Sequence, residues 1–217
     1  MASAGLLGAL ALLLAIAPAS GPAPLPRAPA APEQCLERLR AARLQVAPWP
    51  LRPTALQSGV VCEAPGGVAI RRGGSGLRFQ PAARVNCAFA LRLVRFEAIV
   101  QEEARRTLGS PVRSIVQLGT FNCRRMAAYP DLVSEHSFAN AIDVARFELH
   151  NGRAVVVERD WVRADRPAAT PAAKFLRRLT RRLYDEQVFS VVLTPSYDAH
   201  HRNHLHLDGA AYSVDGT

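Results

Sequence analysis

NAIDVARFELHNGRAVVVE, residues 140–158, decides the fold, because it places two apolar runs on either side of Asn151-Gly152. An Asn-Gly pair between such runs is typical of a two-residue hairpin turn, in which both positions take positive φ angles. We therefore predict a strand over residues 140–147 and a returning strand over residues 153–158. A hairpin pairs its two strands antiparallel, so this stretch favours an antiparallel sheet.

The segments on either side of this hairpin extend the prediction. Residues 88–108 form a strong amphipathic helix, which Gly109-Ser110-Pro111 ends. A second amphipathic helix begins at Pro171 and carries arginines on its outer side. Further expected elements are a helix over 34–43, a strand over 68–72 in a glycine-closed hairpin, strands over 112–118, 189–194 and 204–208, and a loop over 126–139. Helices and strands thus occur in blocks, which predicts an α+β fold with a mainly antiparallel sheet and flanking helices.

The composition fits one domain with a basic surface. The chain has 217 residues, of which 49% are hydrophobic, enough for a core of its own. It carries 27 Lys and Arg against 18 Asp and Glu, and Lys174 is the only lysine. The excess has two explanations: codon bias in a GC-rich genome, or attraction to a polyanion such as nucleic acid, anionic lipid or a cell-wall polymer. Because the arginines are dispersed and not interleaved with aromatic residues, we expect no nucleic-acid partner.

The N-terminus resembles an export signal. Its apolar run over residues 6–16 is too short for a comfortable membrane span, and Ala17-Pro18-Ala19 gives the small-residue pattern of a cleavage site. No Lys or Arg precedes the run, which leaves an uncleaved N-terminal anchor as the alternative. We expect a signal peptide over residues 1–19, a Pro/Ala-rich linker over 20–32 and one domain over 33–213. The protein would be exported to the periplasm or cell envelope, without stable membrane association after leader removal.

Four cysteines lie in the expected domain, namely Cys35, Cys62, Cys87 and Cys123. An even number without a C-x-x-C pair fits two disulfides in an oxidising compartment better than a thiolate zinc site. Three pairings are possible and the sequence does not choose among them; we favour Cys35–Cys62 and Cys87–Cys123. The alternative is buried free thiols in a cytosolic protein, which the leader counts against.

Histidines are concentrated near the C-terminus. Four of the six fall within seven residues, and this group ends in His204-Leu205-His206-Leu207-Asp208. On a strand, alternate side chains share a face. The two histidines and the aspartate therefore point to one side of the expected strand, and the two leucines point to the other.

A second group of polar residues lies far upstream, where His136 precedes Asp143 by seven positions. That spacing does not place both side chains on one helical face. Instead, the loop can carry His136 back over the strand that holds Asp143. Imidazoles and a carboxylate are ligands that suit Zn²⁺, and three protein ligands with a fourth position open is the arrangement of catalytic zinc. The two groups together predict a metal site and a hydrolase.

These motifs carry a family resemblance. The pattern S-x-H-x-x-G-x-A-x-D, followed by a distant H-x-H, resembles that of zinc peptidases such as lysostaphin-type enzymes, D-alanyl-D-alanine carboxypeptidases and penicillin-insensitive murein endopeptidase. Over residues 33–210 the chain also resembles the bacterial extensin-like C-terminal domain family, which is itself similar to those peptidases. The segments that carry this resemblance are CR (123–124), SEH (134–136), NAID (140–143), NGR (151–153), FL (175–176) and YDAHHRNHLHLD (197–208).

The resemblance implies a zinc peptidase-like fold, similar to the D-Ala-D-Ala carboxypeptidases. It assigns the zinc ion to three residues, His136, Asp143 and His206. It places His204 beside the metal as a base or oxyanion stabiliser, and His201 as a further active-site histidine. Arg124 matches a substrate-binding arginine of the carboxypeptidases.

Two functions follow from these observations. The first is that of an exported zinc metallopeptidase that cleaves a peptide or amide bond in peptidoglycan, with peptidoglycan peptides as its partners. The second is a non-catalytic binding domain of the cell envelope that retains the peptidase fold. One residue keeps the second possibility open, because the glycine of the first motif is Ala139 here. If that position requires a positive φ, alanine strains the loop that carries His136.

Overall fold

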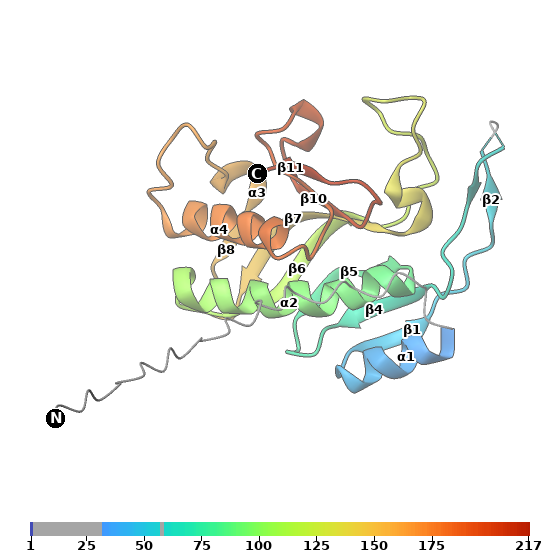
Figure 1. Cartoon of the computed structure of the whole chain (residues 1–217), viewed down its shortest axis with the longest axis horizontal. Helices are drawn as coiled ribbons and strands as arrows, with labels where there is room; N and C mark the ends of the chain where they lie inside the picture. Colours follow the sequence, from blue (N-terminus) through green and yellow to red (C-terminus); the bar gives the residue numbers. More distant parts are fainter. Residues whose placement is uncertain (2–31, 57–58) are drawn as a thin grey trace.

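The computed structural model describes residues 1, 32–56 and 59–217 (Figure 1). The signal peptide and linker expected over residues 1–19 and 20–32 lie outside the described residues, apart from Met1 and Pro32. Its elements are α1 (Pro32–Ala41), β1 (Gln45–Pro48), β2 (Thr54–Ala55), β3 (Val61–Cys62), β4 (Val68–Arg72), β5 (Arg78–Val85), α2 (Cys87–Leu108), β6 (Val112–Gly119), η1 (Glu135–Phe138), β7 (Ala141–Leu149), β8 (Ala154–Val156), α3 (Val157–Asp160), α4 (Pro171–Asp185), β9 (Val191–Leu193), η2 (Ala199–His201), β10 (Leu205–Asp208) and β11 (Val214–Gly216).

A nine-stranded sheet forms the centre of the molecule. Its strands follow the order β1-β4-β5-β6-β7-β10-β9-β11, and β8 pairs with β7. Most neighbouring strands are antiparallel, but β5 pairs with β6, and β9 with β11, in parallel. The predicted α+β class with a mainly antiparallel sheet and flanking helices is therefore confirmed, with a mixed sheet as the refinement.

The hairpin predicted from the Asn-Gly pair is present as β7 and β8, but the predicted two-residue turn is wrong. The Leu149 N–H donates to the Arg153 carbonyl at 2.8 Å, so the loop spans residues 150–152, and of the Asn-Gly pair only Gly152 takes a positive φ. Gly152 has a φ of 82°, a conformation that glycine adopts without steric cost. The returning strand is shorter than the predicted 153–158, because β8 ends at Val156 and the short helix α3 begins at the next residue. Val156 still pairs with Arg146 of β7, and its backbone N–H donates to Asp160 Oδ2 at 2.8 Å, a side-chain hydrogen bond at the point where the strand ends.

Helix α2 is the longest helix of the described residues and matches the prediction for 88–108 closely. Asn86 caps its first turn by accepting a hydrogen bond from the Phe89 N–H, and Gly109, with a φ of 67°, ends it. The helix connects β5 to β6, and a crossover of this kind is what parallel neighbours require. The β5–α2–β6 unit is therefore the source of the first parallel pairing in the sheet.

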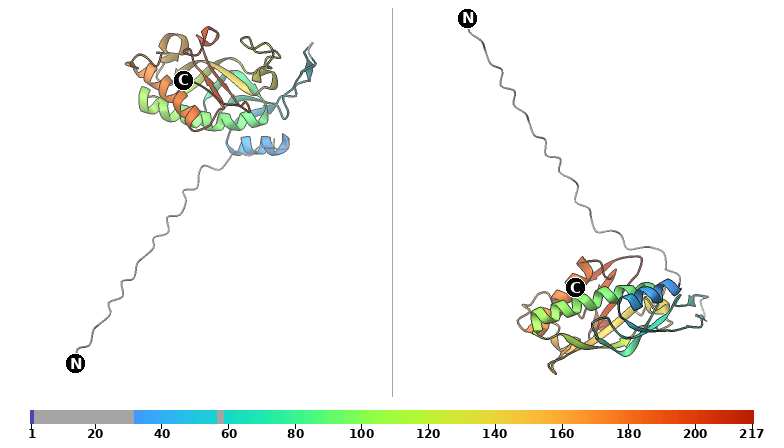
Figure 2. Two further views of the ribbon diagram at one scale, coloured as in Figure 1. Left: turned by 45° about the horizontal axis from the view of Figure 1, so that its top comes forward. Right: turned by 90° about the horizontal axis from the view of Figure 1, so that it is seen from below.

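The helices α1, α2 and α4 lie on one side of the sheet (Figures 1 and 2). In Figures 1 and 2, α2 and α4 run side by side along it, and α1 packs against α2. The core between helices and sheet includes Ile142 and Val144 from β7 and Leu205 and Leu207 from β10. Because side chains alternate along a strand, the residues between these apolar ones face the opposite side of the sheet.

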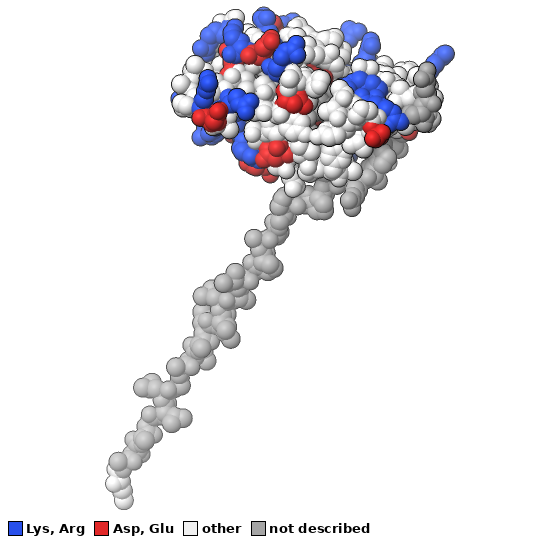
Figure 3. All heavy atoms as spheres, turned by 90° about the horizontal axis from the view of Figure 1, so that it is seen from above, with Lys and Arg blue, Asp and Glu red and all other residues white. Residues whose placement is uncertain are grey.

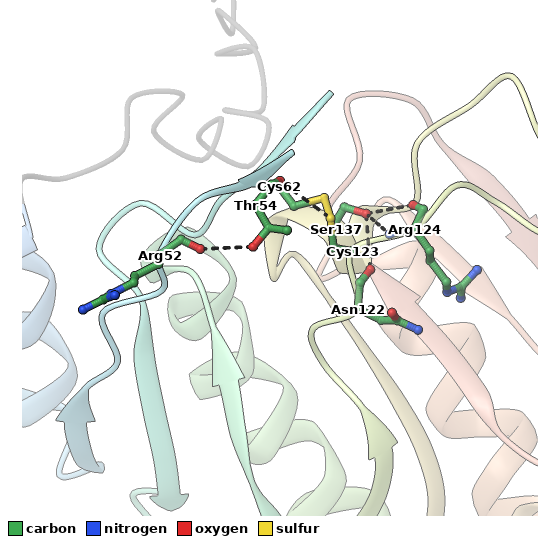
Figure 4. The surroundings of a disulfide bond; sticks show 7 residues. All are labelled: Arg52, Thr54, Cys62, Asn122, Cys123, Arg124 and Ser137. Atoms are coloured by element: carbon green, nitrogen blue, oxygen red, sulfur yellow. Dashed lines mark hydrogen bonds between the residues drawn. A yellow bond between two sulfur atoms is a disulfide. The ribbon is translucent and has the colours of Figure 1, made fainter. Parts of the chain in front are cut away.

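The two disulfides are Cys35–Cys87 and Cys62–Cys123, so the pairing favoured from the sequence is wrong. Packing of α1 against α2 brings the Cα atoms of Cys35 and Cys87 to 5.9 Å. The second bond joins β3, in the projecting β2–β3 hairpin, to the segment after β6, with a Cα separation of 5.6 Å (Figure 4). Tertiary packing, which the order of the cysteines does not reveal, selected the pairing.

Disulfides of this kind are compatible with an extracellular or periplasmic protein. Among the described residues, no helix has the length and apolar character needed to cross a bilayer.

The thiol content gives a direct test of this covalent framework. We predict that protein isolated from its native host shows no free thiol in denaturant, because all four cysteines are bonded. Proteolytic mapping without reduction should recover one peptide pair joined through Cys35 and Cys87 and another joined through Cys62 and Cys123. Detection of four titratable thiols, or of a Cys35–Cys62 peptide pair, would contradict the framework.

Candidate metal centre

Three potential metal ligands converge on the sheet face that points away from the helices. Asp143 lies on β7 and His206 on β10, and these two residues are direct partners in the antiparallel register. Paired positions place their side chains on the same face of the sheet. His136 lies on η1, just before β7, and is only 2% exposed. The loop before β7 thus carries His136 back over the strand that holds Asp143, as the spacing of these two residues predicted.

The distances within this group are short. His136 Nε2 lies 3.2 Å from Asp143 Oδ2, and His206 Nδ1 lies 2.9 Å from Asp143 Oδ1. The two imidazole nitrogens are 3.3 Å apart. Among the described residues, this is the one group of three or more His, Cys, Asp or Glu side chains whose ligand atoms all lie within 4.8 Å of one another.

The turn that holds His136 depends on an unusual backbone conformation. Ala139 ends η1 with φ 49° and ψ 37°, in the left-handed region, and its side chain is buried. The Asn86 side chain donates to the Phe138 carbonyl at 3.0 Å, and the Asn86 N–H donates to the Ala139 carbonyl at 2.9 Å. The position therefore does take a positive φ, and contacts with the start of α2 hold it there although alanine disfavours that conformation.

The charge state of the group is set by its carboxylates. Burial alone would raise the pKa of Asp143, but hydrogen bonds from His136 and His206 outweigh it and hold that pKa well below its usual range. Burial would lower the pKa of His206, whereas hydrogen bonds to Asp143 and Asp208 raise it to about 9. His206 Nε2 lies 2.9 Å from Asp208 Oδ2, which fixes the ring with Nδ1 toward Asp143. Asp208, one of the residues expected on this face, thus orients the His206 ring by its hydrogen bond with Nε2.

His204 lies at the edge of the group. Its Nδ1 donates to Asn203 Oδ1 at 2.9 Å, and its Nε2 lies 3.4 Å from Asp143 Oδ1. The strand begins one residue later than predicted, at Leu205, yet His204 keeps to the side of the sheet expected for it. Burial lowers the pKa of His204 to about 4, so its imidazole is neutral at physiological pH.

His201 stands beside these rings on η2. Its ring centroid is 5.3 Å from that of His204 and 5.7 Å from that of His206. Asp198 caps η2 and also holds the His201 ring, with 2.7 Å between Asp198 Oδ1 and His201 Nδ1. Because a carboxylate only accepts hydrogen bonds, Nδ1 carries the proton and Nε2 is left as an acceptor. Burial lowers the pKa of His201, although its contact with Asp198 acts in the opposite direction.

The group borders a pocket of about 500 Å³. Arg124, the last of the residues expected in the site, also lines this pocket. Arg124 follows β6, and its backbone is fixed by Ser137, whose hydroxyl accepts from the Arg124 N–H at 2.9 Å and lies 2.8 Å from the Arg124 carbonyl (Figure 4). Cys123, which forms a disulfide with Cys62, directly precedes Arg124 in the chain. The pocket walls also include partly exposed aromatic residues, namely Tyr129, Tyr197 and Tyr212.

Arginines are distributed over the molecular surface together with acidic residues. The face shown in Figure 3 carries Lys and Arg side chains interspersed with Asp and Glu, and uncharged residues lie between them. Several arginines are held in ion pairs, such as Arg178 and Arg182 with Glu103. Some of the basic residues therefore form ion pairs within the fold.

Two acidic residues of the pocket, Asp198 and Glu135, received no role from the sequence. Asp198 lies three positions before His201, a spacing typical of an aspartate that caps a short helical turn, and this signal could have found it. Glu135 precedes His136 and lines the pocket, and burial raises its pKa. Nothing in the spacing of Glu135 distinguishes it from a surface glutamate, since its place in the wall follows from the fold of η1.

Comparison with known proteins gives one match. The family model described as "Extensin-like protein C-terminus" matches residues 33–216. No curated protein and no solved structure shows detectable similarity to the chain.

Proposed function

The chain belongs to the extensin-like protein C-terminus family, and from this membership and the geometry of its site we propose that it is an exported zinc-dependent hydrolase. Its substrate would be a peptide or amide bond in peptidoglycan peptides. The observation that supports this proposal most is the convergence of His136, Asp143 and His206 beside an open pocket, which Asp143 and His206 line. The motif resemblance to D-alanyl-D-alanine carboxypeptidases, lysostaphin-type enzymes and murein endopeptidase belongs to the same proposal.

The three side chains fit zinc. The two imidazole nitrogens are 3.3 Å apart, near the roughly 3.4 Å that separates ligands in a tetrahedral site with bonds of about 2.1 Å. Asp143 faces His136 with Oδ2 at 3.2 Å and His206 with Oδ1 at 2.9 Å, and with one oxygen taken as the ligand the three ligand atoms lie within 4.8 Å of one another. The hydrogen bond from His206 Nε2 to Asp208 leaves Nδ1 as the ligand atom, and such carboxylate support is common behind zinc-binding histidines. When bound, zinc would activate a water molecule and polarise the scissile carbonyl.

The neighbouring residues have chemistry suited to hydrolysis. His204 is neutral and its Nε2 faces the ligand group, so it can accept a proton or, once protonated, stabilise negative charge on the carbonyl oxygen. His201, held by Asp198, offers a second imidazole nitrogen close to His204. Arg124, in the pocket wall, carries the charge needed to hold a substrate carboxylate.

One observation favours a second candidate, a non-catalytic domain that binds peptidoglycan in the cell envelope. Ala139 stands where the peptidase motif has glycine, and its left-handed conformation is one that alanine adopts at a cost of about 1 kcal/mol. However, the turn closes despite this cost and still brings His136 to Asp143. We therefore place the hydrolase first.

The metal content of the purified protein and its action on peptidoglycan test the proposal together. We expect about one zinc per chain, because there is one three-ligand group among the described residues. Zinc-loaded protein should release muropeptide fragments or D-alanine from peptidoglycan, chelator should stop the release, and added zinc should restore it. Full zinc occupancy without any released fragment, on several peptidoglycan chemotypes, would overturn the hydrolase and leave the binding domain.

A further inference from the structure

Glu135 is an acidic residue of the pocket whose carboxylate forms no ion pair within the described part of the chain. Its Oε2 accepts a hydrogen bond from Asn140 Nδ2 at 2.6 Å, and no hydrogen bond from a described residue reaches Oε1. No arginine, lysine or histidine among the described residues lies within ion-pair distance of its carboxylate; every recorded pair of this kind involves other acids, such as Glu103 and Asp208.

Glu103 and Asp208 show how the fold compensates a buried carboxylate. Glu103 is fully buried and is neutralised by Arg178 and Arg182, at 2.8 Å each. Asp208 is almost as deeply buried and contacts His206 at 2.9 Å. Removing a carboxylate from water is unfavourable unless an opposite charge or donor compensates, and folded proteins generally supply one. Glu97, also buried, is compensated by the backbone N–H groups of Gly74 and Ser75. Glu135 differs from these acids because it is only half-buried and receives a single amide hydrogen bond, so one carboxylate oxygen remains free to accept from a ligand in the pocket.

The Glu135 carboxylate is also held in position. The Asn140 N–H donates to the Glu135 carbonyl at 3.1 Å, and the Asn140 carbonyl accepts from the Gly209 N–H at 3.1 Å. Asn140 is thus fixed between the turn that carries His136 and the end of β10, and its side chain fixes Glu135. A group arranged in advance in this way loses little conformational freedom when a ligand binds.

We infer that Glu135 binds a primary ammonium group of the ligand, and this inference rests on the proposed function of the pocket. The same pocket presents Arg124, which carries the opposite charge. A pocket with one anionic and one cationic side chain fits a zwitterionic residue, in which a free ammonium group and a carboxylate are close together. Among peptidoglycan peptides, the fitting class contains a diamino acid whose side-chain amine is not acylated.

Paired peptides test this assignment. The probes are two stem peptides containing diaminopimelate, identical except that the side-chain amine is free in one and acetylated in the other. Calorimetry on zinc-loaded wild-type protein should show at least about tenfold tighter binding of the free amine, the scale expected for a hydrogen bond to a charged group. Glu135→Gln should lose this preference and bind both peptides equally. Where mass spectrometry shows that the peptides are cleaved, the preference is measured as the ratio of their kcat/KM values, which should favour the free amine by about tenfold in wild-type protein and fall to about one in Glu135→Gln.

A matched control removes a carboxylate outside the pocket. Glu158 is an exposed glutamate of α3, and Glu158→Gln should keep the wild-type preference. Both variants should retain the wild-type zinc content, because neither glutamate belongs to the ligand group. If Glu135→Gln loses zinc, Glu135 acts on the metal site and the inference is overturned.

The outcomes separate this inference from the proposed hydrolase. If wild-type protein prefers the free amine but releases no fragments, the proposed hydrolase activity is contradicted and the role of Glu135 is supported. If wild-type protein cleaves both peptides equally well, the proposed hydrolase activity is supported and the role of Glu135 is overturned. Failure of wild-type protein to bind either peptide overturns the inference as well.

Discussion

His206→Ala is expected to abolish both zinc binding and hydrolysis. The substitution removes one of three ligand atoms and also leaves Asp143 and Asp208 without the imidazole that both contact at 2.9 Å. Losing a residue that only supports a ligand typically lowers metal affinity by about 10- to 100-fold, and losing the ligand itself has a larger effect. Two like charges would also remain close together in a partly buried site, which lowers the stability of the metal-free protein.

Measured zinc per chain and fragment release from peptidoglycan check this prediction, with circular dichroism to show that the variant is folded. The matched control is His150→Ala, because His150 is exposed at the end of β7 and outside the ligand group. The control should keep both zinc and activity. A folded His206→Ala protein that binds zinc as tightly as wild type would show that the ion is held elsewhere or not by this group.

His204→Ala is expected to separate the metal from the chemistry. His204 lies 3.4 Å from Asp143 but does not belong to the three-residue ligand group, so the variant should keep its zinc. It should nevertheless lose about 10²-fold or more in turnover, the usual scale for a general base or an oxyanion donor. Because the buried imidazole is neutral at physiological pH, its loss removes a proton acceptor and not a fixed charge.

Turnover number and zinc content should be measured on the same preparation. His200→Ala gives a matched control, since His200 is an exposed histidine of the same cluster at the rim of the pocket. It should change turnover by much less than His204→Ala. Loss of zinc from His204→Ala would make His204 a fourth ligand, and unchanged turnover would remove its proposed catalytic role.

Local sequence patterns predicted much of the fold. The hairpin at Asn151-Gly152, the length of α2 and the alternation of Leu205 and Leu207 with polar residues each depend on neighbours within one or two turns of chain. Strand β11 and the β2–β3 hairpin were missed, because two- and three-residue strands carry almost no periodic signal. The parallel pairing of β5 with β6 was missed for another reason: it depends on where α2 packs.

The candidate site also combines features that local sequence predicts with features that depend on tertiary packing. The sequence predicted that His206 and Asp143 belong to one metal site, but their direct pairing follows from the arrangement of their strands as neighbours in the sheet, which the sequence did not predict. The support of His201 by Asp198 is local and could have been predicted from their spacing. In contrast, the position of Glu135 depends on Asn140, whose carbonyl accepts from the Gly209 N–H, a contact between distant residues that forms only in the folded chain.

The order of the disulfide bonds along the chain has a consequence for how the protein matures. The two bonds interleave, and their partners are 52 and 61 residues apart, so each encloses a cysteine of the other. In an unfolded chain, bonds between neighbouring cysteines close shorter loops and are favoured by about 1 kcal/mol in total on loop-closure grounds. Oxidation before folding would therefore trap mispaired chains, and the native pairs depend on folding first or on reshuffling by a disulfide isomerase. In a host without such an enzyme, chains that are oxidised before they fold are expected to remain misoxidised.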